Sequence, residues 1–159
     1  MVKQMLPYPT KFRICSGAAE AKQELVAFDK ALIAAGISNY NLLRVSSILP
    51  IGCQQAETVD KLEGSALLVA YGSRSSNVPG ETISSAVGIG LPAEEGRVGV
   101  IMEFSGVCGA AVAEESVRQM VGAAMENHGI ACREILTSST EAVVPSDGYV
   151  SVISAVAMW

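Results

Sequence analysis

The chain has 159 residues, half of them hydrophobic and 17% charged, with a formal net charge of −5. This length fits a single domain over residues 1–159 with a sizeable buried core, and the sparse charge favours an oligomer. The absence of a Lys/Arg cluster argues against nucleic acid as a partner. Because no apolar run could span a membrane and residues 1–7 lack the apolar core of a signal peptide, we expect a cytoplasmic protein.

The first half of the chain predicts one helix and two strands. Apolar residues at steps of three or four predict a helix over residues 20–37 that stops at Gly36. Residues 41–48 predict a strand that ends before a proline, and residues 51–64 are typical of a surface loop. Residues 66–72 predict a second, short strand, followed by a loop. The apolar positions of the helix are Leu25, Phe28, Leu32 and Ala35.

The second half predicts four strands and a second helix. Strands are expected over residues 81–91 and 98–104, and a helix over 112–128 carries an apolar stripe on one face. Two final strands are expected over 130–139 and 149–158. Short turns between neighbouring strands favour antiparallel pairing. The fold class is therefore α/β in content and α+β in arrangement, with mainly antiparallel sheets.

Two adjacent hydroxyl side chains, Ser46 and Ser47, lie in an otherwise apolar segment and can cut the peptide bond between them. Attack of the Ser47 hydroxyl on the Ser46 carbonyl converts the amide into an ester, and β-elimination then releases Ser46 as a new C-terminus. The dehydroalanine left at Ser47 hydrolyses with loss of ammonia to a pyruvoyl group, a ketone that acts as an electron sink in decarboxylation. The alternative is a solvated turn, where most serine pairs lie.

The segments around this serine pair and further along the chain carry a family resemblance. They follow one order at compatible spacings and cover nearly the whole chain from residue 28. The segments concerned are 27–37, 39–50, 70–72, 78–84, 101–106, 114–120 and 155–159. Together they resemble the pyruvoyl-dependent arginine decarboxylases. No one segment is decisive, and the resemblance rests on several in register.

The resemblance implies a four-layer αββα sandwich that assembles as a homotrimer of processed units. It also implies self-cleavage into a β chain, 1–46, and an α chain, 47–159, with a covalent pyruvoyl cofactor derived from Ser47. The implied reaction converts L-arginine, a small-molecule substrate, to agmatine and carbon dioxide. It would proceed through a Schiff base between the substrate amine and the pyruvoyl ketone.

Two residues are candidates for catalysis beside Ser47. Glu103 lies in an apolar strand, where burial raises the pKa of a carboxyl and allows it to return a proton to the substrate's α-carbon. A Glu on the solvent face of a half-exposed strand has the same pattern, but the resemblance assigns the proton donor to this position. Asn41 is the candidate for stabilising the oxyanion at the scissile carbonyl. From the residues alone, an Asn that caps a turn explains this position equally well. The resemblance instead assigns an active-site residue to it.

Four residues are candidates for substrate binding. A carboxylate grips a guanidinium through two parallel hydrogen bonds, and the resemblance gives this role to Asp29; the alternative is a solvent-facing Asp paired with a lysine. Leu32, Tyr40 and Ile48 are candidates for the apolar walls of the pocket. Tyr40 departs from the family, which often has a smaller aliphatic residue there, so a decarboxylase of another amino acid is an alternative function.

A non-catalytic trimeric relative is the alternative from another functional class. The joint presence of both serines with Asn41 and Glu103 argues against it. The four cysteines are widely separated and show no metal-binding or redox spacing. We therefore expect no metal site, and buried, reduced thiols at Cys15, Cys53, Cys108 and Cys132.

Overall fold

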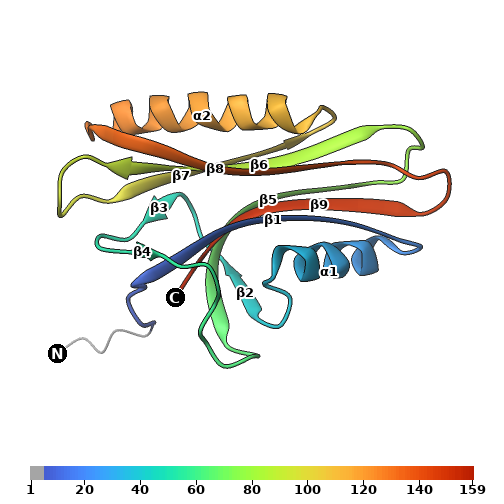
Figure 1. The fold of residues 1–159 in the computed structure, drawn as a ribbon, viewed down its shortest axis with the longest axis horizontal. Helices are drawn as coiled ribbons and strands as arrows, with labels where there is room; N and C mark the ends of the chain where they lie inside the picture. Colours follow the sequence, from blue (N-terminus) through green and yellow to red (C-terminus); the bar gives the residue numbers. More distant parts are fainter. Residues whose placement is uncertain (1–5) are drawn as a thin grey trace.

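The computed structural model describes residues 6–159, which form four layers (Figure 1). The elements in chain order are β1 (Lys11–Ala21), α1 (Glu24–Ala35), β2 (Asn41–Arg44), β3 (Ile48–Leu49), β4 (Gln54–Gln55), β5 (Ala66–Ser76), β6 (Thr82–Pro92), β7 (Gly99–Gly106), α2 (Ala110–Asn127), β8 (Cys132–Val143) and β9 (Tyr149–Met158). Helix α2 covers a four-stranded sheet of order β3-β7-β6-β8, and α1 covers a five-stranded sheet of order β2-β5-β9-β1-β4. The two sheets pack face to face, which confirms the expected αββα sandwich.

The central strands β9 and β6 are buried on both faces. β9 pairs antiparallel with β5 and β1, and β6 pairs antiparallel with β7 and β8. Because a helix covers one face of each sheet and the other sheet covers the second face, these strands are continuous runs of apolar and small residues. Only the short pairings of β4 with β1 and of β2 with β5 are parallel within the described chain, residues 6–159.

Strand β1 occupies residues 11–21, where the sequence pattern predicts no strand, and α1 begins at Glu24, later than expected. Because β1 contains several small residues, it lacks the clear alternation of apolar and polar side chains that predicts a strand. A Cβ added at Gly17 would lie 2.3 Å from the carbonyl oxygen of Ala31, so α1 packs directly on the backbone of β1. The predicted end of α1 is confirmed, because Gly36 adopts a left-handed conformation with φ 76°.

The strand predicted over residues 41–48 is two short strands in different sheets, so this prediction was wrong. β2 pairs with β5 in the five-stranded sheet, whereas β3 pairs with β7 in the four-stranded sheet. Residues 45–47 cross from one sheet to the other. Apolar residues lie on both sides of the crossing, and the sequence pattern does not mark the change of sheet. β5 also continues to Ser76, beyond its expected end, by pairing with β9.

A polar layer lies between two apolar clusters in the interface of the two sheets. On β9, Ser154 stands between Val152, which belongs to one cluster, and Val156, which belongs to the other. The hydroxyls of Ser154 and Ser16 are 2.8 Å apart, and Ser16 is 2.7 Å from Ser138 of the opposite sheet. Hydrogen bonding of this kind offsets the cost of burying hydroxyls. The hydroxyl layer, as we call it, consists of Ser16, Ser85, Ser105, Ser138 and Ser154.

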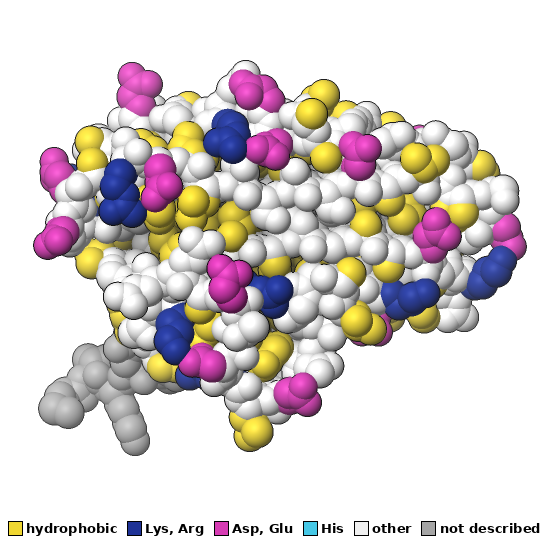
Figure 2. All heavy atoms as spheres, in the orientation of Figure 1, with side chains coloured by type: hydrophobic (Ala, Val, Ile, Leu, Met, Phe, Trp, Pro, Cys, Tyr) yellow, Lys and Arg dark blue, Asp and Glu magenta, His cyan; other side chains and the backbone are white. Residues whose placement is uncertain are grey.

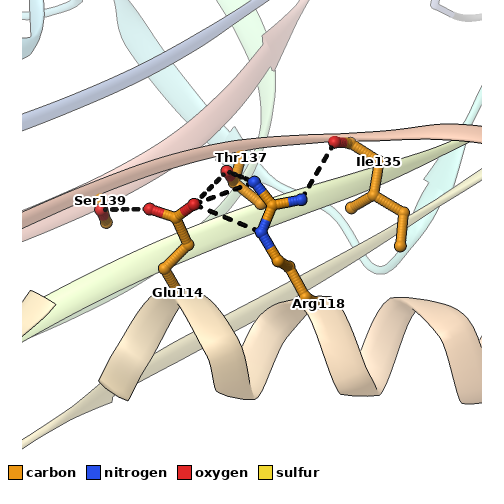
Figure 3. Close-up of polar contacts among 5 residues, drawn as sticks. All are labelled: Glu114, Arg118, Ile135, Thr137 and Ser139. Carbon is orange, nitrogen blue, oxygen red and sulfur yellow. Dashed lines mark hydrogen bonds and ion pairs between the residues drawn. The ribbon is translucent and has the colours of Figure 1, made fainter. Parts of the chain in front are cut away.

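Helix α2 is tied to the edge strand β8 by an ion pair and two hydroxyls (Figure 3). Arg118 Nη2 lies 2.9 Å from Glu114 Oε1, one helical turn away. Thr137 and Ser139 of β8 donate hydrogen bonds to the Glu114 carboxylate at 2.9 and 3.1 Å, and Arg118 donates to the Ile135 carbonyl at 3.4 Å. The hydrogen bonds that the Glu114 carboxylate accepts hold its pKa below its ordinary value, and the bond from Arg118 has the largest effect.

The surface has mixed charge and one exposed apolar helix face. On the face shown in Figure 2, cationic and anionic side chains are interspersed. Within residues 6–159, no helix is both long and apolar enough to cross a membrane. Apolar side chains are exposed along α1, where Leu25 is 76%, Ile33 59% and Val26 44% exposed. Apolar surface of this kind is typical of a protein contact when it is contiguous.

Candidate active site

The Ser46–Ser47 peptide lies between two backbone anchors, one in each sheet. The Val45 N–H donates to the Val69 carbonyl of β5 at 3.1 Å, and the Ile101 N–H of β7 donates to the Ser47 carbonyl at 2.7 Å. Ser46 is exposed, Ser47 is half-buried, and neither belongs to a strand. The Ser46–Ser47 bond is therefore fixed on both sides, while the two residues themselves lie outside the regular sheets.

Glu103 lies on β7 and points into the space between the two sheets. Side chains two residues apart on a strand share a face, and both neighbours of Glu103 on this face lie between the sheets. Ile101 belongs to an apolar cluster, and the Ser105 hydroxyl donates to the Ser73 carbonyl of β5 at 3.1 Å. A Cβ added at Gly72 would lie 3.3 Å from the Glu103 Cβ. The carboxyl is half-buried, which favours the apolar setting over the solvent-facing alternative.

Two opposing effects act on the Glu103 carboxyl. Burial raises its pKa, and the positive charge of Arg44 opposes this with a smaller effect. Arg44 ends β2, with its guanidinium carbon 4.4 Å from the centroid of the Tyr71 ring, and it donates to the Tyr71 carbonyl at 2.8 Å. Neither Arg44 nor Tyr71 was predicted from the sequence as part of the site. The only signal available was their place in two of the segments shared with the family.

Asn41 lies away from the Ser46–Ser47 bond of its own chain. Its side-chain amide donates to the Gly64 carbonyl at 2.8 Å, and its side chain is exposed. β2 runs from Asn41 to Arg44, a length of about 10 Å at the usual rise of an extended chain. The structure therefore does not bring the Asn41 amide to the Ser46 carbonyl within one chain.

The substrate-binding candidates fall in two places. Asp29 and Leu32 line one shallow hollow on the outer side of α1. Tyr40 and Leu32 pack against the same apolar cluster, and the Tyr40 hydroxyl donates to the Lys61 carbonyl at 3.3 Å. Ile48 lies on β3, immediately after Ser47, and is 39% exposed. In one chain, Asp29 and Leu32 thus lie on the outer helix α1, whereas Glu103 lies between the two sheets.

The four cysteines are free, as expected, but they are not all buried. Cys15 is buried, and desolvation raises its pKa to about 11. Cys132 is exposed, so the expectation of a buried thiol is wrong there, because β8 is an edge strand. Across residues 6–159 no three metal-ligating side chains come together.

Residues 11–159 match the family described as pyruvoyl-dependent arginine decarboxylase. The chain belongs to this family. Among the curated pyruvoyl-dependent arginine decarboxylases, that of Methanocaldococcus jannaschii is 39% identical over 154 residues, which are 95% of this chain and 90% of that protein. The Methanococcus aeolicus protein is 35% identical over 155 residues, 96% of this chain and 93% of its own. The Pyrococcus abyssi protein is 37% identical over 153 residues, 95% of this chain and 96% of its own.

The prosthetic group of pyruvoyl-dependent arginine decarboxylases is a covalently bound pyruvoyl group. The surroundings of Ser47 fit such a group. Its carbonyl is fixed by Ile101, and Glu103 follows two residues later on the same strand with a half-buried carboxyl. A carbonyl reagent at Ser47 would therefore have both a backbone donor and an acid on β7.

Proposed function

We propose that the chain is a self-processing decarboxylase that converts L-arginine to agmatine and carbon dioxide with a pyruvoyl group made from Ser47. The observation that carries the proposal is the position of the Ser46–Ser47 bond, held at the crossing between the sheets beside the strand of Glu103. The family membership and the curated relatives support arginine as the substrate.

In the proposed maturation, the Ser47 Oγ attacks the Ser46 carbonyl carbon, and the peptide C–N bond breaks to leave an ester. Elimination breaks the Cβ–Oγ bond of Ser47, so the β chain, 1–46, leaves with a carboxylate. Hydrolysis with loss of ammonia completes the first residue of the α chain, 47–159. The anchor at Val45 keeps the departing end beside β5 during these steps, and the Ile101 anchor keeps the Ser47 carbonyl in place.

In the proposed turnover, the pyruvoyl ketone supplies an electrophile for the substrate's α-amine and a sink for the electron pair left by carbon dioxide. The Ile101 N–H holds the carbonyl of residue 47 and stabilises negative charge that develops on its oxygen. Glu103 then returns a proton to the α-carbon. Burial supports this role, because a raised pKa keeps the carboxyl protonated closer to neutral pH.

Asp29 is proposed to bind the substrate guanidinium, with Leu32, Tyr40 and Ile48 as apolar walls and Asn41 at the scissile carbonyl. Because Asp29 and Asn41 lie apart from Glu103 in one protomer, we assign these groups to neighbouring subunits of a homotrimer. The exposed apolar side chains of α1, which flank Asp29, support a subunit contact there.

Intact mass and turnover of two variants test the proposal. Ser47→Ala should remain a single uncut chain without activity, whereas Glu103→Gln should cleave fully and lose turnover by about 100-fold or more, within the usual range for a missing general acid. Ser146→Ala, which removes a hydroxyl from an exposed turn, is the matched control and should behave as wild type. An uncut wild-type chain with an unmodified residue 47 contradicts the proposal.

Release of carbon dioxide from a panel of amino acids tests the substrate. Arginine should be the best substrate, and borohydride should trap it on the α chain. A preference for another amino acid would retain the mechanism and overturn the assignment to arginine. A cleaved chain that traps no amino acid would overturn the decarboxylase itself.

A further inference from the structure

Three consecutive carbonyls of β5 accept hydrogen bonds from side chains, directly after the point where β2 stops pairing with this strand. The Tyr71 carbonyl accepts from Arg44 at 2.8 Å and the Gly72 carbonyl from the Ser85 hydroxyl at 2.7 Å. The Ser73 carbonyl accepts from the Ser105 hydroxyl at 3.1 Å. The two serines come from β6 and β7, so this stretch of β5 is the place where the opposite sheet is bonded to it.

The side chain of Glu103 lies directly over the middle residue of this stretch. A Cβ at Gly72 would lie 3.3 Å from the Glu103 Cβ, 3.5 Å from its Cγ and 3.4 Å from the Phe104 carbonyl oxygen. Such distances are shorter than, or at the limit of, ordinary contact between carbon atoms. Because Gly72 has no side chain, the Glu103 side chain can occupy the space above it and lie between the sheets.

Two hydrogen bonds to β5, from Ser85 and Ser105, fix the height of Glu103 above this strand. Ser105 lies two residues after Glu103 on the same face of β7, and Ser85 lies on the neighbouring strand β6, directly opposite Ser105. Their bonds to adjacent carbonyls of β5 hold β7 at one register relative to the crossing that contains Ser47. Both serines belong to the hydroxyl layer, and Glu103 continues this layer toward the edge of the sandwich.

We infer that Gly72 and Ser105 are positioning residues for Glu103: Gly72 provides the slot for its side chain, and Ser105 holds its strand against β5. This inference rests on the proposed function, in which Glu103 is the proton donor. Displacement of a reacting group by about 1 Å can cost about 100-fold in rate. This role gives a chemical reason for Gly72 in segment 70–72, one of the segments that resemble the family.

Gly72→Ala and Ser105→Ala test the inference in the processed enzyme. Both variants should cleave fully and keep KM for arginine near the wild-type value, while kcat falls by about 10- to 100-fold. In Gly72→Ala the added methyl group pushes the carboxyl toward water, which lowers its pKa, so the basic limb of the kcat profile should move to lower pH. If Gly72→Ala fails to cleave, Ser105→Ala carries the test, since it adds no atom.

A double-variant cycle separates positioning from a general structural effect. If Gly72 and Ser105 act through Glu103, adding either substitution to Glu103→Gln should change kcat by less than about twofold. Ser16→Ala is the matched control, because it removes a hydroxyl from the same layer on β1, away from Glu103. It should lower stability without changing kcat or the pH profile.

The outcomes distinguish this inference from the proposed function. Full turnover in Glu103→Gln would overturn the assignment of Glu103 as the proton donor, whatever the result for Gly72→Ala. Loss of turnover in Glu103→Gln with unchanged kcat in Gly72→Ala and Ser105→Ala would overturn the positioning inference alone. Additive losses in the double variants would also overturn it, because they would show that Gly72 and Ser105 act independently of the carboxyl.

Discussion

Glu103 is a carboxyl group whose protonation depends on two neighbours of opposite effect. The apolar cluster around Ile101 disfavours the charged form, and Arg44 favours it. Burial has the larger effect, so the pKa is raised. Arg44 cannot approach more closely while its guanidinium stacks on Tyr71 and bonds the Tyr71 carbonyl. The stacking therefore keeps a positive charge near the acid without forming an ion pair that would deprotonate it.

Removal of the Arg44 charge should move the pH dependence of turnover in a defined direction. The proton donor must be protonated, so kcat falls as pH rises through the pKa of Glu103. Because Arg44 lowers that pKa, Arg44→Met should raise it, and the basic limb of the kcat profile should move to higher pH. The pH at which kcat falls is measured from the rate of carbon dioxide release between neutral and alkaline pH.

Arg97→Met is the matched control for the loss of one positive charge. Arg97 lies on the turn between β6 and β7, 3.8 Å from Glu94, and has no part in the site. Its removal should leave the limb in place, since solvent and salt screen distant charges. A limb that shifts equally in both variants, or that shifts to lower pH in Arg44→Met, would contradict the assignment of Glu103 as the acid.

At the scale of elements, several of the polar contacts between α2 and β8 converge on one carboxylate, that of Glu114. Glu114 accepts bonds from Arg118, Thr137 and Ser139, and its side chain is 35% exposed. Glu114→Ala should therefore lower the free energy of unfolding by about 1 to 2 kcal/mol, less than for a fully buried network because solvent screens it. Urea unfolding at neutral pH measures the loss.

The neighbouring Glu115 provides the control. It lies on the same helix and accepts a hydrogen bond from the exposed Gln119 side chain at 2.9 Å, so Glu115→Ala should change stability by less than about 0.5 kcal/mol. The folded-state pKa of Glu114 is lowered, so its stabilisation is present at neutral pH and is lost as pH falls through that pKa. Wild type and Glu114→Ala should differ less in acid; an equal difference at all pH values would contradict this account.

The sequence predicted elements well where one physical signal dominates. Strand β9 was predicted with its observed bounds, because turn residues precede a run of apolar and small residues, and Gly36 marked the end of α1. β1 was missed because small residues at the contact with α1 remove its alternation. The crossing at residues 45–47 was missed because a change of sheet depends on partners far along the chain. For the same reason sequence indicated Glu103 but not its contacts with Arg44 and Gly72.

At the scale of the whole molecule, one chain contains the candidate residues in two separate groups. Asp29 and Leu32 lie outside the five-stranded sheet on α1, and Glu103 lies between the sheets beside Ser47. The exposed apolar residues around Asp29 favour contact with a second copy. In the homotrimer that we propose, head-to-tail contacts place Asp29 and Leu32 of one subunit beside Ser47 of the next.

Co-expression of two defective variants tests this arrangement. Asp29→Ala should raise KM for arginine about 10- to 100-fold, the usual effect of losing a charge-assisted pair of hydrogen bonds, and Glu103→Gln should lower kcat. If one subunit supplies Asp29 and its neighbour supplies Glu103, about a quarter of the sites in randomly mixed trimers are intact, and activity at low arginine concentration recovers to that level. If each subunit builds its own site, every site keeps one defect and the mixture stays as inactive as its components. The pure variants, mixed only after assembly, are the control and should show no recovery in either case.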